Sequence, residues 1–142
     1  MLCDVDHFKS LNDRHGHLFG DEVLRDVAAT LRGGLRDTDA AYRYGGEEFA
    51  LLLRETDVAA ATAVVERLRS AIEQRFARRI PEGVTVSFGL AATGPQGQSP
   101  SELLAAADAA LYRAKGAGRN CWRVAEQSPT AMRLMPSTRA AG

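Results

Sequence analysis

The sequence is short of several features that identify large classes of proteins. It holds two cysteines, Cys3 and Cys121, which are far apart and lack the spacing of metal ligands, so neither a disulfide framework nor a zinc motif is indicated. No apolar run is long enough to span a bilayer, and the N-terminus lacks the pattern of a signal peptide. We therefore expect a cytoplasmic protein whose cysteines are reduced.

The sequence also lacks an excess of charge of either sign. Lys and Arg together number 18, as do Asp and Glu, so the formal net charge is zero. Bulk binding to nucleic acid or to a membrane surface is not favoured, because both depend on a basic excess. Any anion that the protein binds must be held by a local site. The chain of 142 residues is long enough for one domain with a core of its own.

What is present is a regular alternation of strand and helix patterns. The order β-α-α-β-β-α-β-α-β over residues 1–126 predicts a ferredoxin-like α/β sandwich, with a mixed, mostly antiparallel central sheet flanked by helices. Residues 127–142 have no periodicity, and we expect a disordered tail there. Strands are expected at 1–5, 40–44, 49–53, 84–92 and 121–124, and helices at 7–16, 21–35, 56–76 and 102–114.

The stretch RYGGEEF, residues 43–49, joins two of these strands. Gly45 and Gly46 predict a two-residue hairpin with a primed turn, in which glycine supplies positive φ angles. Glu47 and Glu48 follow directly, and alternation along a strand sends them to opposite faces. One of them can then reach a neighbouring ligand. The alternative is a solvated hairpin tip whose charges guard against edge-to-edge aggregation.

Asp4 and Asp6 end the first strand and add two more carboxylates. Hard oxygen donors of this kind hold Mg²⁺ together with substrate phosphates, and such ions serve in phosphoryl transfer. The alternative is a charged strand-to-helix turn in which Asp6 caps the helix that follows.

Two polar pairs lie elsewhere in the chain. Asn12 and Asp21 offer an amide and a carboxylate that match the edge of a guanine base, although helix capping is the alternative, above all for Asp21. Lys115 and Arg119 lie where a helix gives way to a glycine-rich turn, and both suit phosphate groups. Their alternative is a favourable interaction with the helix dipole.

Taken together, DVDHFKSLND, GHLFGDEVL, RYGGEEF, TVSFG and ADAALYRAKGAGRN resemble the GGDEF family of diguanylate cyclases, in order and spacing, over about residues 1–125. The resemblance implies a nucleotidyltransferase that joins two GTP molecules into cyclic di-GMP and releases two pyrophosphates. It further implies a homodimer whose two half-sites face each other, and Mg²⁺ or Mn²⁺ as cofactor.

The resemblance also implies roles for single residues. Glu47 is a metal ligand and the base for the attacking 3′-hydroxyl, and Glu48 assists the metal site. Asp4 and the backbone carbonyl of Val5 complete the metal ligands. The implied substrate contacts are Gly45 and Gly46 near the α-phosphate, Asn12 and Asp21 at the guanine, and Lys115, Arg119 and the backbone N–H groups near His7 and Phe8 at the terminal phosphates.

The sequence also resembles the family at a site for product inhibition. Arg36 and Asp39 form an R-x-x-D pattern before the glycine turn, and Arg67 on the following helix is a further contact in the implied cyclic di-GMP site. The alternative is ordinary surface charge between a helix and a strand.

The resemblance fails before Met1, where the family carries a further helix and a D-x-L-T-G-L-x-N-R-R segment. We therefore expect an N-terminally truncated domain with exposed apolar sheet surface. The alternative function is a catalytically silent module that binds GTP or cyclic di-GMP. A weaker alternative is another metal-dependent nucleotidyltransferase or cyclase, which competition by ATP would distinguish.

Overall fold

The computed structural model describes residues 1–94 and 97–126; the tail expected at 127–142 lies outside the described residues. The order of elements is the one predicted from the sequence. The elements are β1 (Leu2–Val5), α1 (Phe8–His15), α2 (His17–Gly33), β2 (Ala40–Arg43), β3 (Glu48–Leu52), α3 (Val58–Phe76), β4 (Val86–Leu90), α4 (Pro100–Gly116) and β5 (Trp122–Val124).

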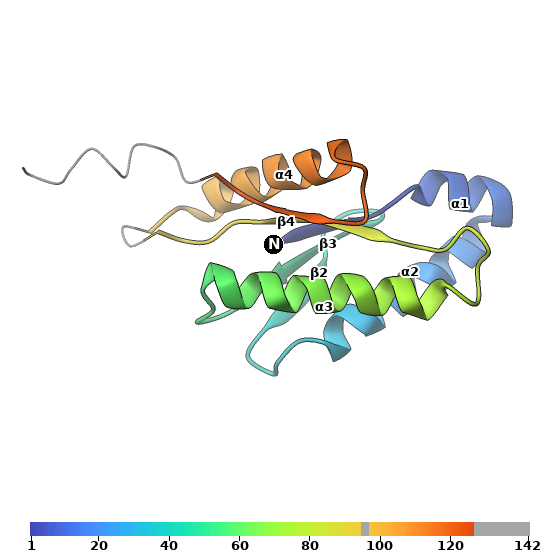
Figure 1. The fold of residues 1–142 in the computed structure, drawn as a ribbon, viewed down its shortest axis with the longest axis horizontal. Helices are drawn as coiled ribbons and strands as arrows, with labels where there is room; N and C mark the ends of the chain where they lie inside the picture. Colours follow the sequence, from blue (N-terminus) through green and yellow to red (C-terminus); the bar gives the residue numbers. More distant parts are fainter. Residues whose placement is uncertain (95–96, 127–142) are drawn as a thin grey trace, which may run out of the picture.

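Within the described residues, five strands form one mixed sheet in the order β2-β3-β1-β4-β5. β1 lies at its centre and pairs antiparallel with β3 and β4, β2 pairs antiparallel with β3, and only β5 runs parallel to its neighbour β4. Figure 1 shows α4 on one face of the sheet and α2 and α3 on the other. The predicted α/β fold with a mostly antiparallel sheet is therefore confirmed.

The core is split between these two faces because side chains alternate along β1. Cys3 and Val5 belong to the larger core, under α2 and α3. Leu2 faces the other way and packs with Ala107 and Leu111 of α4. Both faces of β1 are thus buried.

Helix boundaries follow local capping where a cap exists. Asp57 precedes α3, and its carboxylate accepts a hydrogen bond from the backbone N–H of Ala60 at 2.7 Å. Ser99 and Glu102 form a capping box at the start of α4. α2 differs, because it begins at His17 after Gly16 rather than at residue 21.

The predicted two-residue primed turn is wrong. Gly45 and Gly46 both have φ angles outside the left-handed region. The connection between β2 and β3 is wider, and the backbone N–H groups of Tyr44 and Gly45 both donate to the carbonyl of Glu48, at 2.8 and 3.2 Å. The wider turn removes the need for the positive φ that a primed turn imposes.

The sheet face that carries α4 is only partly covered. Tyr42 lies opposite Ala50, and Ala40 opposite Leu52, so these side chains share the face on which Ala50 packs against the α4 cluster. Tyr42 is 60% and Leu52 51% exposed. The strands β2 and β3 therefore present apolar surface to solvent beyond the edge of α4.

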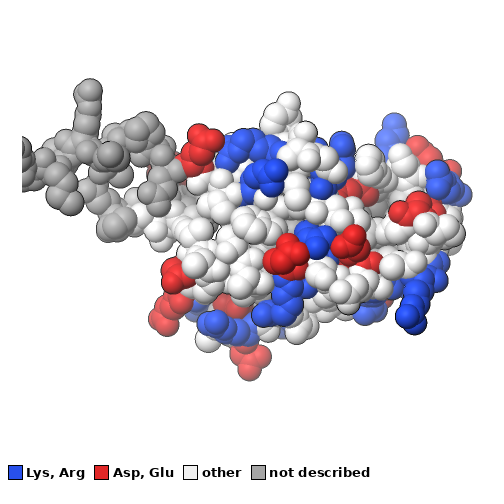
Figure 2. Space-filling model, viewed as in Figure 1, with Lys and Arg blue, Asp and Glu red and all other residues white. Residues whose placement is uncertain are grey.

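Charge on the molecular surface is mixed. Figure 2 shows acidic and basic side chains interspersed over the face it presents, which agrees with the balanced composition. Among the residues that the structure describes, no helix is both long and apolar enough to cross a membrane.

Candidate active site

Asp4, near the end of β1, is the centre of the candidate site. The pairing of β1 with β3 places Glu48 opposite Asp4, and the N–H of Val5 donates to the carbonyl of Glu47 at 3.1 Å. The last turn of α4 brings in Lys115, whose Nζ lies 3.1 Å from Asp4 Oδ2. Residues predicted from three separate motifs are thus brought together by the tertiary fold.

Burial and mutual repulsion disfavour the ionised forms of these carboxylates. Burial raises the pKa of Asp4, and the charges of Lys115 and Arg119 only oppose that rise. Burial also raises the pKa of Glu47, and the nearby carboxylates of Asp4 and Glu48 raise it further. Closely placed carboxylates that repel one another are stabilised when a cation binds between them.

The donor set fits a hard divalent cation. Asp4 and Glu47 supply carboxylate oxygens, and Val5 offers a backbone carbonyl between them in the chain, which suits Mg²⁺ or Mn²⁺ with phosphate oxygens as further ligands. Among the described residues, no group of three or more His, Cys, Asp or Glu side chains is close enough to hold a metal by itself. These oxygens could therefore form only part of a coordination sphere, and further ligands would have to come from a bound molecule.

The two glycines of the turn differ in their surroundings. A Cβ on Gly45 would lie 2.6 Å from Glu48 Oε2, whereas a Cβ on Gly46 would meet no atom within 4 Å. The guanidinium of Arg43 donates to the carbonyl oxygens of both glycines, with the shortest contact 2.7 Å. Gly45 therefore makes room for the Glu48 side chain, and Arg43 closes the turn.

Asn12 of α1 faces Gly20 of α2. A Cβ on Gly20 would lie 1.7 Å from Asn12 Oδ1, so any larger residue there would force the Asn12 side chain to move. In the described part of the chain, this buried oxygen has no hydrogen-bond partner. Asp21 is exposed on the next residue of α2 and lines a hollow of about 340 Å³ between α2 and β2. Because Asp21 lies inside the helix, the capping alternative for it is wrong.

Asp6 does not cap α1, so the capping alternative for this residue is wrong. The N-cap residue is His7, with φ 54°, and no side chain of the described residues caps this helix end. The carboxylate of Asp6 instead accepts hydrogen bonds from the hydroxyls of Thr85 and Ser87, both at 2.7 Å, and from the N–H of Asn120 at 3.0 Å. The first N–H groups of α1, at Phe8 and after, are thus left for another acceptor.

The R-x-x-D residues surround one segment between α2 and β2. Asp39 accepts hydrogen bonds from the N–H groups of Arg36 and Arg54, both at 3.2 Å. The guanidinium of Arg67 donates to the carbonyl of Gly34 at 2.7 Å. Asp39 and Arg67 therefore stabilise the backbone here, while the side chain of Arg36 is exposed.

Sequence reasoning missed the parts played by Asp6 and Asn120. Their contact joins residues 114 positions apart in the chain, so no local pattern indicates it. One signal in the sequence could have indicated a buried polar partner. Thr85 and Ser87 alternate with apolar residues along a predicted strand, and hydroxyls that face the core need hydrogen-bond partners.

Comparisons with known proteins agree with this geometry. A family model described as "Diguanylate cyclase, GGDEF domain" matches residues 1–121. Diguanylate cyclase VdcA of Vibrio cholerae is 42% identical over 125 residues, which cover 84% of this chain and 37% of VdcA. Response regulator PleD of Caulobacter vibrioides is also 42% identical over 125 residues, covering 84% of this chain and 27% of PleD. The chain thus spans well under half the length of these curated relatives.

Solved structures are similar as well. The GGDEF domain of DgcB from Caulobacter crescentus, in complex with c-di-GMP, has a TM-score of 0.81 at 36% identity and covers 89% of this chain and 76% of that one. The active GGEEF domain of a diguanylate cyclase from Vibrio cholerae has a TM-score of 0.79 at 34% identity, with 89% and 81% covered.

Proposed function

Because this chain belongs to the GGDEF domain family, we propose that it is a diguanylate cyclase that condenses two GTP molecules into cyclic di-GMP and releases two pyrophosphates. The observation that carries the proposal is the meeting of Asp4, Glu47 and Lys115 at one end of the sheet. Two carboxylates beside a cationic side chain supply the groups that a nucleoside triphosphate and its metal require.

In each half-reaction, the 3′-oxygen of one GTP forms a bond to the α-phosphorus of the other. The bond from that phosphorus to the bridging oxygen breaks, and pyrophosphate leaves with the electron pair. The carboxylate of Glu47 accepts the proton of the hydroxyl.

Mg²⁺ or Mn²⁺, held by Asp4, Glu47 and the Val5 carbonyl, supplies positive charge to the phosphate oxygens when bound. Lys115 and Arg119 add cationic groups for the terminal phosphates, together with the N–H groups at the start of α1 near His7 and Phe8. This arrangement offsets the charge that develops on the leaving pyrophosphate.

Guanine recognition is assigned to Asn12 and Asp21. The amide of Asn12 meets ring acceptors of the base, and the carboxylate of Asp21 accepts hydrogen bonds from its N–H groups. Adenine lacks the N1–H and 2-amino donors of guanine and would leave the Asp21 carboxylate without these hydrogen bonds, which disfavours ATP.

Each protomer provides one set of these groups and therefore binds one GTP. Joining two nucleotides needs two such sites face to face, so the proposed enzyme acts as a homodimer. The product then binds at Arg36, Asp39 and Arg67 and inhibits the enzyme, as the R-x-x-D pattern in this position supports.

The test is incubation of the protein with GTP and Mg²⁺ at several protein concentrations, with products separated by chromatography and identified by mass. Cyclic di-GMP that forms with a steeper than linear dependence on protein concentration supports a cyclase that acts as a dimer. Binding of GTP without any product supports a silent nucleotide-binding module instead.

A further inference from the structure

The turn that carries Arg119 has a strained backbone. Gly118, Arg119 and Asn120 follow one another with φ angles of 111°, 65° and 45°. Glycine tolerates such angles and asparagine visits them, but an arginine rarely does. Strain of this kind persists only where the surrounding structure enforces it, and it is concentrated at functional sites.

One restraint on this turn acts on its backbone. Asp6 is buried, and its Oδ2 accepts the N–H of Asn120 at 3.0 Å and the hydroxyl of Thr85 at 2.7 Å. Asp6 follows Asp4 by two residues on the chain. The turn is therefore anchored to the same strand end that carries the candidate metal carboxylate.

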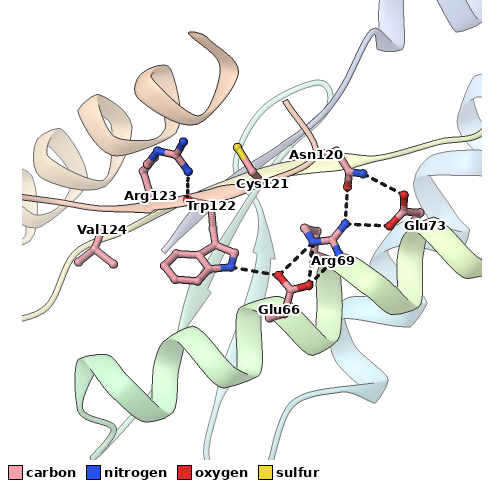
Figure 3. Close-up of a pocket in the computed structure, with 8 residues that line it drawn as sticks. All are labelled: Glu66, Arg69, Glu73, Asn120, Cys121, Trp122, Arg123 and Val124. Carbon is pink, nitrogen blue, oxygen red and sulfur yellow. Dashed lines mark hydrogen bonds and ion pairs between the residues drawn. The ribbon is translucent and has the colours of Figure 1, made fainter. Parts of the chain in front are cut away.

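A second restraint acts on the side chain of Asn120 from α3 (Figure 3). Its Oδ1 accepts from the guanidinium of Arg69 at 2.8 Å, and its Nδ2 donates to Glu73 Oε1 at 3.0 Å. Arg69 and Glu73 are themselves paired at 2.8 Å. The amide of Asn120 thus has both its oxygen and its nitrogen engaged.

The same residues line a hollow of about 600 Å³ between α3 and β5. Its carboxylates are already paired, because Arg69 donates to Glu66, Glu73 and Asn120, and the indole of Trp122 donates to Glu66 at 3.1 Å. Arg123, which also lines the hollow, donates to the carbonyl of Trp122 at 2.8 Å. An entering ion would have to break these pairs, so we assign the network a structural task rather than a ligand.

We propose that Glu73, Arg69 and Asn120 form a brace that positions Arg119 beside Asp4 for contact with the nucleotide phosphates. Arg119 directly precedes Asn120, whose N–H is held at 3.0 Å by Asp6, two residues along the chain from Asp4. The inference rests on the proposed function for the role of Arg119, and adds that α3 sets how tightly the phosphates are held.

The experiment compares the affinities of the full chain for GTP and GMP, measured by calorimetry with Mg²⁺. Glu73→Ala should weaken GTP binding about fivefold and leave GMP binding unchanged, because GMP lacks the terminal phosphates. Glu73→Gln keeps an acceptor for Asn120 and should restore most of the affinity. Glu66→Ala is the matched control, since Glu66 also pairs with Arg69 but does not contact Asn120.

A double-mutant cycle with Arg119→Ala makes the test specific. Arg119→Ala alone should weaken GTP binding about tenfold, and Glu73→Ala should add nothing in that background. Additive effects, or equal losses for GTP and GMP, would overturn the brace even where Arg119 proves essential. If Arg119→Ala leaves the affinity for GTP unchanged, both the brace and the phosphate role of Arg119 are overturned. Product formation by the unaltered chain tests catalysis separately.

Discussion

At the scale of single residues, the two glycines between β2 and β3 do different things. Gly46→Ala should leave the free energy of unfolding unchanged or raise it by up to about 1 kcal/mol, because its φ is ordinary and the space is open. Gly45→Ala should displace Glu48 and lower turnover about tenfold, with little loss of stability. Urea unfolding and initial rates measure both effects. Equal destabilisation by the two variants would instead support the primed turn that the sequence predicts.

Glu47 is the residue on which proton transfer depends in the proposed mechanism. Glu47→Gln keeps the size of the side chain but cannot accept the proton, so turnover should fall by about 10²–10⁴-fold with the fold retained. Rates of cyclic di-GMP formation and circular dichroism provide the measurements. Asp108→Asn removes one charge on an exposed position of α4 and serves as control. Turnover of Glu47→Gln close to that of the control would exclude Glu47 as the base.

At the scale of elements, the close approach of α4 to β4 depends on Gly89. A Cβ there would lie 2.1 Å from the carbonyl oxygen of Ala107 and 2.3 Å from the backbone nitrogen of Leu111. Backbone atoms cannot move aside cheaply, so Gly89→Ala should lower the free energy of unfolding by about 1–3 kcal/mol or more. Thermal or urea unfolding measures the change.

Gly33→Ala is the control for this substitution, because a Cβ on Gly33 meets no atom within 4 Å. Its stability should remain within about 1 kcal/mol of the unaltered protein. A Gly89→Ala protein as stable as this control would contradict the close packing of α4 on the sheet.

At the scale of the whole molecule, Asp26 joins α2 to the end of α3. Burial opposes its ionisation, but hydrogen bonds from Arg75 and Arg79 outweigh that effect and hold its pKa below the usual value. A lowered folded-state pKa gives stability that is present above the unfolded value, about 3.9, and is lost as pH falls through the folded value.

Asp26→Asn should therefore cost about 1 kcal/mol of stability near pH 7, and the difference should shrink as pH falls below about 4. Urea unfolding at pH 7 and at pH 3 compares the two proteins. A difference that stays constant, or grows toward pH 3, would contradict the assigned sign.

The proposed product inhibition also belongs to the scale of the whole molecule, because Arg36 lies in the segment between α2 and β2 and not beside the candidate catalytic carboxylates. Arg36→Ala should raise the cyclic di-GMP concentration that halves the rate by about tenfold, since it removes a charged contact. Asp39→Ala is a poorer probe, as Asp39 also holds two backbone N–H groups. The measurement is the rate of cyclic di-GMP formation at increasing concentrations of added product. Unchanged inhibition of the Arg36→Ala protein would contradict the assignment of Arg36 to the product site.

Short-range chemistry made much of this protein predictable. The order of strands and helices follows from the spacing of apolar residues, and the caps Asp57 and Ser99 set helix starts through contacts three residues away. The motif residues Asp4, Glu47 and Lys115 were all identified from the chain. Each of these signals lies within a few neighbouring residues, where sequence and structure are directly linked.

Long-range contacts decided the rest. The turn at Gly45, the close packing at Gly89 and the bond between Asp6 and Asn120 each depend on an atom supplied by the folded surroundings. The raised pKa of Glu47 depends in the same way on burial and on Asp4. By itself the sequence determined which elements form and which groups are available for chemistry. Only the tertiary structure decided how those groups are spaced and held, because their positions depend on partners far away in the chain.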